Sequence, residues 1–269
     1  MTLWSHYVFR RGADVHDLWD SLHTGRAMRL LYIAGRGFDV RAQVAMREYL
    51  SSLKGSGVKV ERAELLLVGF SGYQLDEPLQ NITVENSQAL ETMFAKFGAA
   101  RSINVGAAAG EDVSATQALR RGVNDVLKRI TDHTDIVLDV SSLPRVAYLA
   151  LMTRILNRLV PDKTVANPLA ANGVNFQVLV AEDANLDAQI LAEDLSSDPV
   201  LIPGFSSAVQ VESVQDWPLV WFPLLGEHRV NQLQQIMRSN LIPDAAEICP
   251  VLPHPSRHAR RADRLLVEY

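Results

Sequence analysis

The feature that most constrains the fold is the alternation of short apolar runs with helical patterns of apolar residues. Leu30–Ala34, Glu64–Gly69 and Asp135–Val140 are three such runs. After the first, apolar residues recur at the spacing of one helix face, and Gly55 opens a Gly-Ser-Gly stop. Strands that alternate with helices of this length form βαβ units, and right-handed crossovers then place helices on both faces of a mostly parallel sheet. The sequence therefore predicts an α/β fold.

Two weaker apolar runs complete the predicted sheet. Ser102–Val105 and Asn175–Ala181 are expected to be its third and fifth strands, giving a Rossmann-like arrangement. Segment 1–28 precedes the first strand and contains a short amphipathic helix. Four of its side chains are spaced to cover the apolar surface of a neighbour: Val15, Leu18, Trp19 and Leu22.

A change in composition divides the chain near residue 199. Residues 182–199 carry six acids and no Lys or Arg, which is typical of a solvated hinge. We therefore expect a Rossmann-like domain over 1–199 and a smaller C-terminal β/α appendage over 200–269. The appendage would hold the apolar run Pro218–Leu225, a helix near Glu227–Leu241 and an Arg-rich last helix. Extra strands on the same sheet are the alternative.

Composition excludes several classes of protein. The chain has 269 residues, is 48% hydrophobic and 21% charged, and carries a net charge of −5, which argues against a generally basic surface for duplex nucleic acid or an anionic membrane. It contains no apolar stretch of about 18–20 residues and no apolar signal-peptide core. Its one cysteine, Cys249, excludes an internal disulfide framework and is expected to be an inert core thiol. These features indicate a cytoplasmic protein.

The loop after the first strand is one half of the candidate ligand site. In open α/β sheets, ligands bind beyond the carboxyl ends of the strands, where the strand order reverses. If the order is 3-2-1-4-5, the loops after strands one and four flank that point. Gly35 and Gly37 would let the backbone approach a ligand, with Arg36 beside them. Asp39 is a candidate acid–base residue, although a tight turn with Asp39 as the helix cap is the alternative.

The loop after the fourth strand is the other half. Ser141, Ser142 and Arg145 surround the start of a helix, and their hydroxyl and guanidinium groups suit a phosphate or carboxylate. Asp139 ends an otherwise apolar strand, so its carboxylate needs a partner and is a second candidate acid–base residue. A purely structural bond to a backbone amide or an arginine is the alternative.

The C-terminus forms a local basic patch on an acidic protein. Residues 254–269 carry a net charge of +2, whereas the other 253 carry −7. The patch is a candidate site for an anion, a nucleic acid or a partner protein, and a solvated helix face paired with residues 182–199 is the alternative. Its four arginines are Arg257, Arg260, Arg261 and Arg264. No metal site is expected, because His16, Asp20 and His23 share the spacing of ordinary polar helix positions.

Two resemblances add to these patterns. The opening Gly35-Arg36-Gly37-Phe38-Asp39 followed by Arg41 resembles the GxGxDxR loop of some S-adenosylmethionine-dependent methyltransferases, which implies a methyl-donor site. Those enzymes place an acid at the end of strand two, where this chain has Val68-Gly69-Phe70. The same loop, with DVSSLPR and LPHPSRHARRAD, also resembles uncharacterised proteins associated with bacterial antiviral defence.

These observations lead to three functional hypotheses. The first is a sensor or effector that binds a nucleotide-like small molecule between the two loops. The second is a non-catalytic subunit that binds a partner protein, and the third is a methyltransferase. The patterns do not identify a cofactor.

Overall fold

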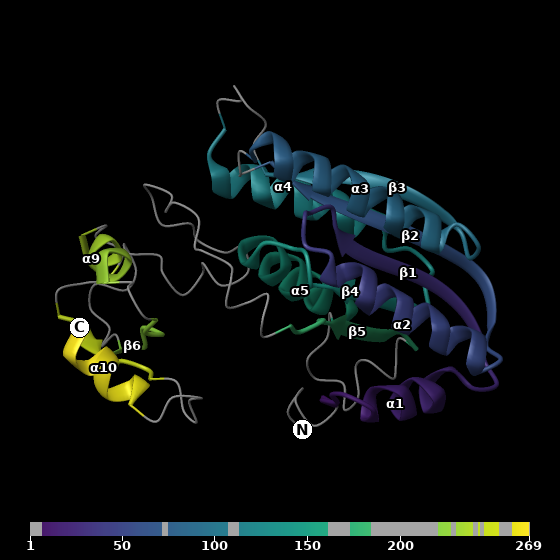
Figure 1. Ribbon diagram of the computed structural model, residues 1–269, viewed down its shortest axis with the longest axis horizontal. Helices are drawn as coiled ribbons and strands as arrows, with labels where there is room; N and C mark the ends of the chain where they lie inside the picture. Colours follow the sequence, from purple (N-terminus) through teal and green to yellow (C-terminus); the bar gives the residue numbers. More distant parts are fainter. Residues whose placement is uncertain are drawn as a thin grey trace. The chain divides into compact units, whose positions relative to one another are not determined.

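The computed structural model describes residues 7–71, 75–106, 113–160, 173–183, 220–226, 230–238, 242, 245–252 and 260–268. The chain forms two compact units, Met1–Ile190 with Ile202–Gly204, and Leu191–Leu201 with Phe205–Tyr269. The first unit contains α1 through β5 and the second contains β6 through α10 (Figure 1). Most of the predicted hinge, from residue 184 to the boundary at residue 199, lies outside the described residues.

Strands and helices alternate along the described residues of the first unit, as the apolar pattern predicted. The elements are α1 (Asp14–His23), β1 (Ala27–Gly35), α2 (Arg41–Gly55), β2 (Lys59–Phe70), α3 (Glu77–Phe94), β3 (Ala99–Val105), α4 (Ala115–Arg129), β4 (Asp135–Asp139), α5 (Arg145–Leu159) and β5 (Asn175–Leu179).

The sheet is parallel throughout and has the order β3-β2-β1-β4-β5 (Figure 1). This result confirms the predicted α/β, Rossmann-like fold and gives the strand order on which the site prediction depends. β1 and β4 are hydrogen-bonded neighbours, with Ala34 paired to Asp139. The loops that follow these two strands therefore leave the same edge of the sheet side by side.

Helices cover both faces of the sheet because the side chains of each strand alternate between two cores. Leu31 and Ile33 of β1 pack with apolar residues of α4 and α5 in one core. Leu30 and Tyr32 pack with residues of α1, α2 and α3 in the other. The two helices that precede β4 and β5 thus lie on the opposite face from those that precede β2 and β3.

Two strands begin earlier than predicted, because backbone hydrogen bonds extend them beyond their apolar residues. β2 begins at Lys59 rather than Glu64, because its polar first half pairs with β1 from Ala27 onwards. β3 begins at Ala99 rather than Ser102, and its first four residues are exposed because β3 is an edge strand. Such residues are held by ladder hydrogen bonds, which leave no apolar signal in the sequence.

Helix α1 packs against the rest of the first unit. Its Trp19 is buried, stacks edge-on against Tyr49 of α2 with ring centroids 5.3 Å apart, and donates from Nε1 to Oε1 of Gln177 at 2.8 Å. The prediction that this helix covers apolar surface is confirmed for Trp19 and in part for Val15, whereas Leu18 and Leu22 are only partly buried and belong to neither core. His23, its last residue, is fully buried, and neither ring nitrogen has a hydrogen-bond partner among the described residues.

We expect His23→Leu to make the protein less sensitive to acid. Burial lowers the pKa of His23 below 6.5, an effect that Asp135 and Asp20 oppose and Arg26 adds to. Below about pH 6.5 the unfolded chain therefore binds a proton at His23 more readily than the folded state does. The free energy of unfolding falls as the pH is lowered through this range. The free energy of unfolding should be measured with urea at pH 5.5 and pH 8. Between pH 8 and pH 5.5 it should fall less for His23→Leu than for the wild type.

The exposed His16, on the same helix, provides the control for this measurement. His16→Gln removes a histidine from the same helix without touching the core, because its side chain is half exposed beside Glu48. Equal pH dependence of His23→Leu and the wild type would contradict the assignment of acid sensitivity to His23.

The described part of the second unit is small. It contains a parallel pair of two-residue strands, β6 (Val220–Trp221) and β7 (Glu247–Ile248), with α9 (Val230–Arg238) and α10 (Arg261–Glu268). Cys249 was predicted to be a core thiol, and this prediction is wrong. Its side chain is only partly buried, with Sγ 3.7 Å from Oε1 of Glu247, because the two strands are too short to bury the run around it. None of the described helices has the length and apolar character needed to cross a membrane.

Candidate functional site

The two predicted loops are in direct contact at the carboxyl edge of the sheet. Ser142 donates from its hydroxyl to the carbonyl oxygen of Gly35 at 2.9 Å. A Cβ atom on Gly35 would lie 2.6 Å from the carbonyl carbon and oxygen of Ser142, and one on Gly37 would lie 2.8 Å from the same oxygen. Both glycines are therefore needed for the close packing of one loop on the other.

Asp39 is held inside its own loop. Its carboxylate accepts hydrogen bonds from the backbone N–H of Arg41 at 3.0 Å and from Nε of Arg41 at 2.9 Å. The first bond reaches the first residue of α2, whose N-cap position is held by Val40, so it favours the alternative interpretation of a tight turn but not Asp39 as the cap itself. A catalytic role for Asp39 stays a prediction, and it would require its ion pair with Arg41 to open.

Asn86 of α3 is a site residue that the sequence analysis missed. Its side chain is buried and donates from Nδ2 to the carbonyl oxygens of Gly37 and Asp39, at 2.7 and 3.2 Å. Gln43 donates to its Oδ1 at 2.8 Å. The amide thus fixes the loop after β1 from outside it. The available signal was an asparagine four residues before Leu90, on the apolar face of the predicted helix.

Asp139 is the most perturbed carboxyl group of the site. It is fully buried, accepts from the hydroxyl of Tyr32 at 2.9 Å through Oδ2, and accepts from the backbone N–H of Ser141 at 3.0 Å through Oδ1. Burial raises the pKa of Asp139 to about 6, although hydrogen bonds from Ser141 and Tyr32 lower it. The geometry makes Asp139 a positioning residue that ties β4 to β1 and to its own loop, and a catalytic role stays a prediction.

The serine hydroxyls are engaged within the protein. Ser142 bonds to Gly35 as described, and the Ser141 hydroxyl accepts from the backbone N–H of Ala181 at 2.9 Å. The site retains two exposed charged side chains, those of Arg36 and Arg145, and neither has an ion-pair or hydrogen-bond partner for its guanidinium among the described residues. The aliphatic part of Arg36 lies beside Gly69 at the end of β2.

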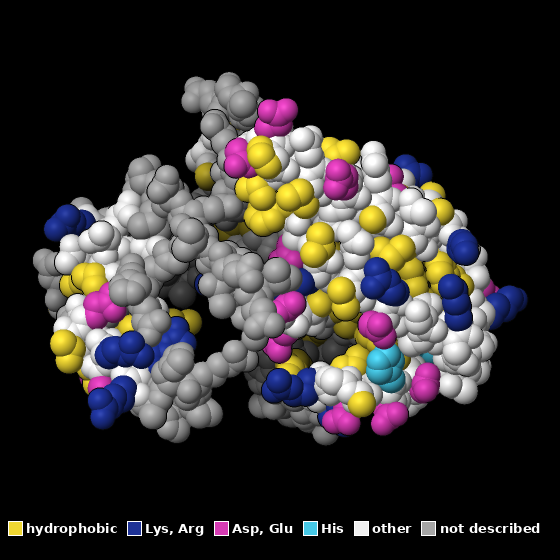
Figure 2. All heavy atoms as spheres, viewed as in Figure 1, with side chains coloured by type: hydrophobic (Ala, Val, Ile, Leu, Met, Phe, Trp, Pro, Cys, Tyr) yellow, Lys and Arg dark blue, Asp and Glu magenta, His cyan; other side chains and the backbone are white. Residues whose placement is uncertain are grey.

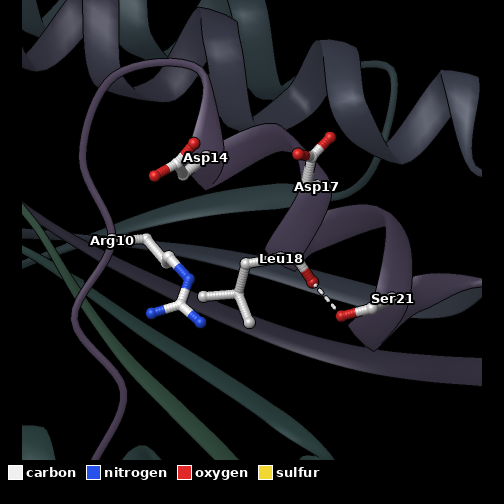
Figure 3. Close-up of a pocket in the computed structure, with 5 residues that line it drawn as sticks. All are labelled: Arg10, Asp14, Asp17, Leu18 and Ser21. Atoms are coloured by element: carbon white, nitrogen blue, oxygen red, sulfur yellow. Dashed lines mark hydrogen bonds between the residues drawn. The ribbon is translucent and has the colours of Figure 1, made fainter.

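A shallow hollow of about 330 Å³ lies beside α1 in the first unit, away from these loops (Figure 3). Arg10 points toward Leu18 in this view, whereas the carboxylate of Asp17 points away from it. The Ser21 hydroxyl is bonded to the carbonyl oxygen of Leu18 at 2.8 Å. The polar groups do not converge, so the hollow lacks the features of a ligand site.

Metal-binding side chains do not gather in the described parts of the chain. No group of three His, Cys, Asp or Glu residues there is arranged to hold a metal ion. His16 is half exposed whereas His23 is fully buried, so the two rings lie in different environments. Of the predicted C-terminal patch, Arg260, Arg261 and Arg264 belong to the second unit and Arg257 lies outside the described residues.

Because comparison with known proteins gives no match, the class of this protein is defined by its fold and its site. No protein-family model matches the chain, and no curated protein is similar to it. The observed class is a Rossmann-like α/β protein in which two contacting loops mark the point where the strand order reverses.

Proposed function

We propose that the first unit binds an anionic, nucleotide-type small molecule at the carboxyl edge of β1 and β4. The observation that carries this proposal is the pair of exposed, unpaired guanidinium groups of Arg36 and Arg145, on loops joined by the bond from Ser142 to Gly35. Arginine suits phosphates and carboxylates because its planar donors form paired hydrogen bonds.

The position in the sheet supports the proposal. The crossover after β1 passes over one face and the crossover after β4 passes over the other, which opens a crevice between their loops in folds of this class. Arg145 is also the first residue of α5, where backbone N–H groups and the helix dipole favour an anion. The tight loop packing and the bonds of Asn86 and Asp139 would hold the two arginines in a fixed frame before a ligand arrives.

The test is a thermal-shift panel with ATP, GTP, NAD, S-adenosylmethionine and cyclic dinucleotides, followed by calorimetry on any ligand found. A ligand at about 100 times its Kd stabilises by about 2.7 kcal/mol. We expect Arg145→Ala to weaken binding by about 1.5–3 kcal/mol, or roughly 10- to 150-fold in Kd, because a charged hydrogen bond is lost.

Arg47 of α2 provides a matched control, since it is exposed and lies more than one helical turn beyond the loop that ends at Arg41. Arg47→Ala should leave Kd unchanged. Equal affinity of Arg145→Ala and the wild type would remove Arg145 from the site. A response to S-adenosylmethionine alone would favour the methyltransferase hypothesis.

A second candidate function, binding of a partner protein, is favoured by one observation in the second unit. Val220, Phe222 and Leu224 alternate along β6 and its continuation, and their side chains are 42%, 62% and 83% exposed. Alternate residues of a strand share one side, so these three form an apolar strip of the kind found in interface cores. A folded protein that is silent across the ligand panel but elutes in a stable complex on gel filtration would favour this function.

A further inference from the structure

The outer surface of α4 and the adjoining part of α5 concentrate positive charge. The two helices together contain seven Lys or Arg residues and one acid. Since the whole chain carries −5 and these helices carry +6, the remaining residues carry −11. On the face shown in Figure 2, acidic side chains gather over α1, whose first turn holds Asp14 and Asp17. α4 and α5 are therefore basic elements of an otherwise acidic chain.

Side-chain contacts bring the cations of the two helices together. Arg154 of α5 donates from Nη2 to Oδ1 of Asn124 on α4 at 3.2 Å, and Arg158 donates to the carbonyl oxygen of Ile130 at the end of α4 at 2.9 Å. Asn124 in turn lines a shallow hollow of about 340 Å³. The α4 residues that line it are Gln117, Arg120, Arg121, Asn124, Asp125 and Lys128. We call these residues, with Arg154 and Arg158, the α4–α5 basic surface.

This surface contains five cations and one carboxylate. Its one carboxylate, Asp125, lies 2.6 Å from Nζ of Lys128, and this pair is exposed enough that solvent weakens it. Arg120 is exposed and has no side-chain partner among the described residues. Gln117, Arg120, Asn124 and Lys128 follow the spacing of one helix face, a row that extends about 16 Å.

We propose that the α4–α5 basic surface binds the phosphate backbone of a nucleic acid. A strand of nucleic acid repeats its charge about every 3.4 Å along the duplex axis, so this 16 Å row, in which Arg120 and Lys128 are the cations, can extend past several phosphates. The amides of Gln117 and Asn124 add hydrogen bonds of the kind made to phosphate oxygens. An acidic protein partner is disfavoured, because none of the large exposed hydrophobic side chains lies on α4 or α5 to form an interface core.

Fluorescence anisotropy tests this proposal on the full chain, with labelled single-stranded and duplex oligonucleotides of mixed sequence. We expect binding with little sequence preference at about 50 mM salt, weakening as salt rises with a log–log slope of about −3 for three to four phosphate contacts. The double variant Arg120→Glu with Lys128→Glu should bind at least about 10-fold more weakly, with a slope reduced by about 2.

The control is Arg47→Glu with Lys96→Glu, which changes the net charge equally at exposed positions on and after helices of the opposite face. It should bind like the wild type, and melting temperatures should show that both double variants are folded. The milder pair Arg120→Gln with Lys128→Gln covers the case in which charge reversal prevents folding, and it too should bind more weakly. Three results would overturn the proposal: no binding up to about 100 μM protein at low salt, equal losses in test and control, or binding of polyglutamate without nucleic acid.

Discussion

Replacing Gly35 by alanine is expected to destabilise the first unit by about 3 kcal/mol. The new Cβ atom would lie 2.6 Å from the carbonyl carbon and oxygen of Ser142. These are backbone atoms on a neighbouring loop, so the clash cannot be relieved by a side-chain rotation. Gly35 is also the last residue of a central strand that pairs with β2 and extends the edge shared with β4, which leaves its own backbone little room to move.

Gly55→Ala provides the matched control for this substitution. Gly55 ends α2, has no heavy atom within 4 Å of the added Cβ, and lies in a helix, where alanine is favoured by up to about 1 kcal/mol. Urea unfolding of both variants should therefore give shifts of opposite sign. A Gly35→Ala protein as stable as the wild type would mean that the two loops are free to separate, and the proposed fixed frame for Arg36 and Arg145 would fail with it.

Asp139 is expected to make the protein lose about 3 kcal/mol of stability between about pH 4 and pH 7. Burial raises the pKa of Asp139 to about 6, so the folded state keeps a proton that the unfolded chain releases near its ordinary pKa of 3.8. The folded state therefore binds more protons over this interval, and its free energy of unfolding falls as pH rises. His23 acts in the opposite direction below about pH 6.5, because burial lowers its pKa.

A comparison with Asp139→Asn isolates the contribution of this carboxyl group. The free energy of unfolding of the wild type, relative to that of the variant, should fall by about 3 kcal/mol from pH 4 to pH 7. Tyr32→Phe supplies a second measurement, since it removes a hydrogen bond that lowers the pKa of Asp139. That variant should shift the transition to higher pH. A difference that stays constant with pH would show that Asp139 does not titrate in this range.

The candidate site was predictable in part because its residues belong to two strand ends. In a parallel sheet, every strand finishes at the same edge, so Gly35 and Asp139 were bound to share that edge once both runs were strands. What each group does there was not predictable. The glycines contact Ser142, the hydroxyl of Ser141 bonds to Ala181, and Asn86 reaches the site from α3, all through contacts between residues far apart in the chain.

The sequence by itself determined the kind of layer structure that this protein forms. Apolar runs of strand length, separated by helical stripes, have few arrangements that bury both faces, and right-handed crossovers reduce them further. Only the tertiary structure decided where charge gathers. Arg120 and Arg154 are unremarkable helix positions in the sequence, and they share a surface because α4 and α5 pack side by side on the same core. The spacing of apolar residues indicates which face of a helix or strand is buried. It does not indicate which residues of other elements lie beside the exposed face, because that depends on how the fold packs the elements.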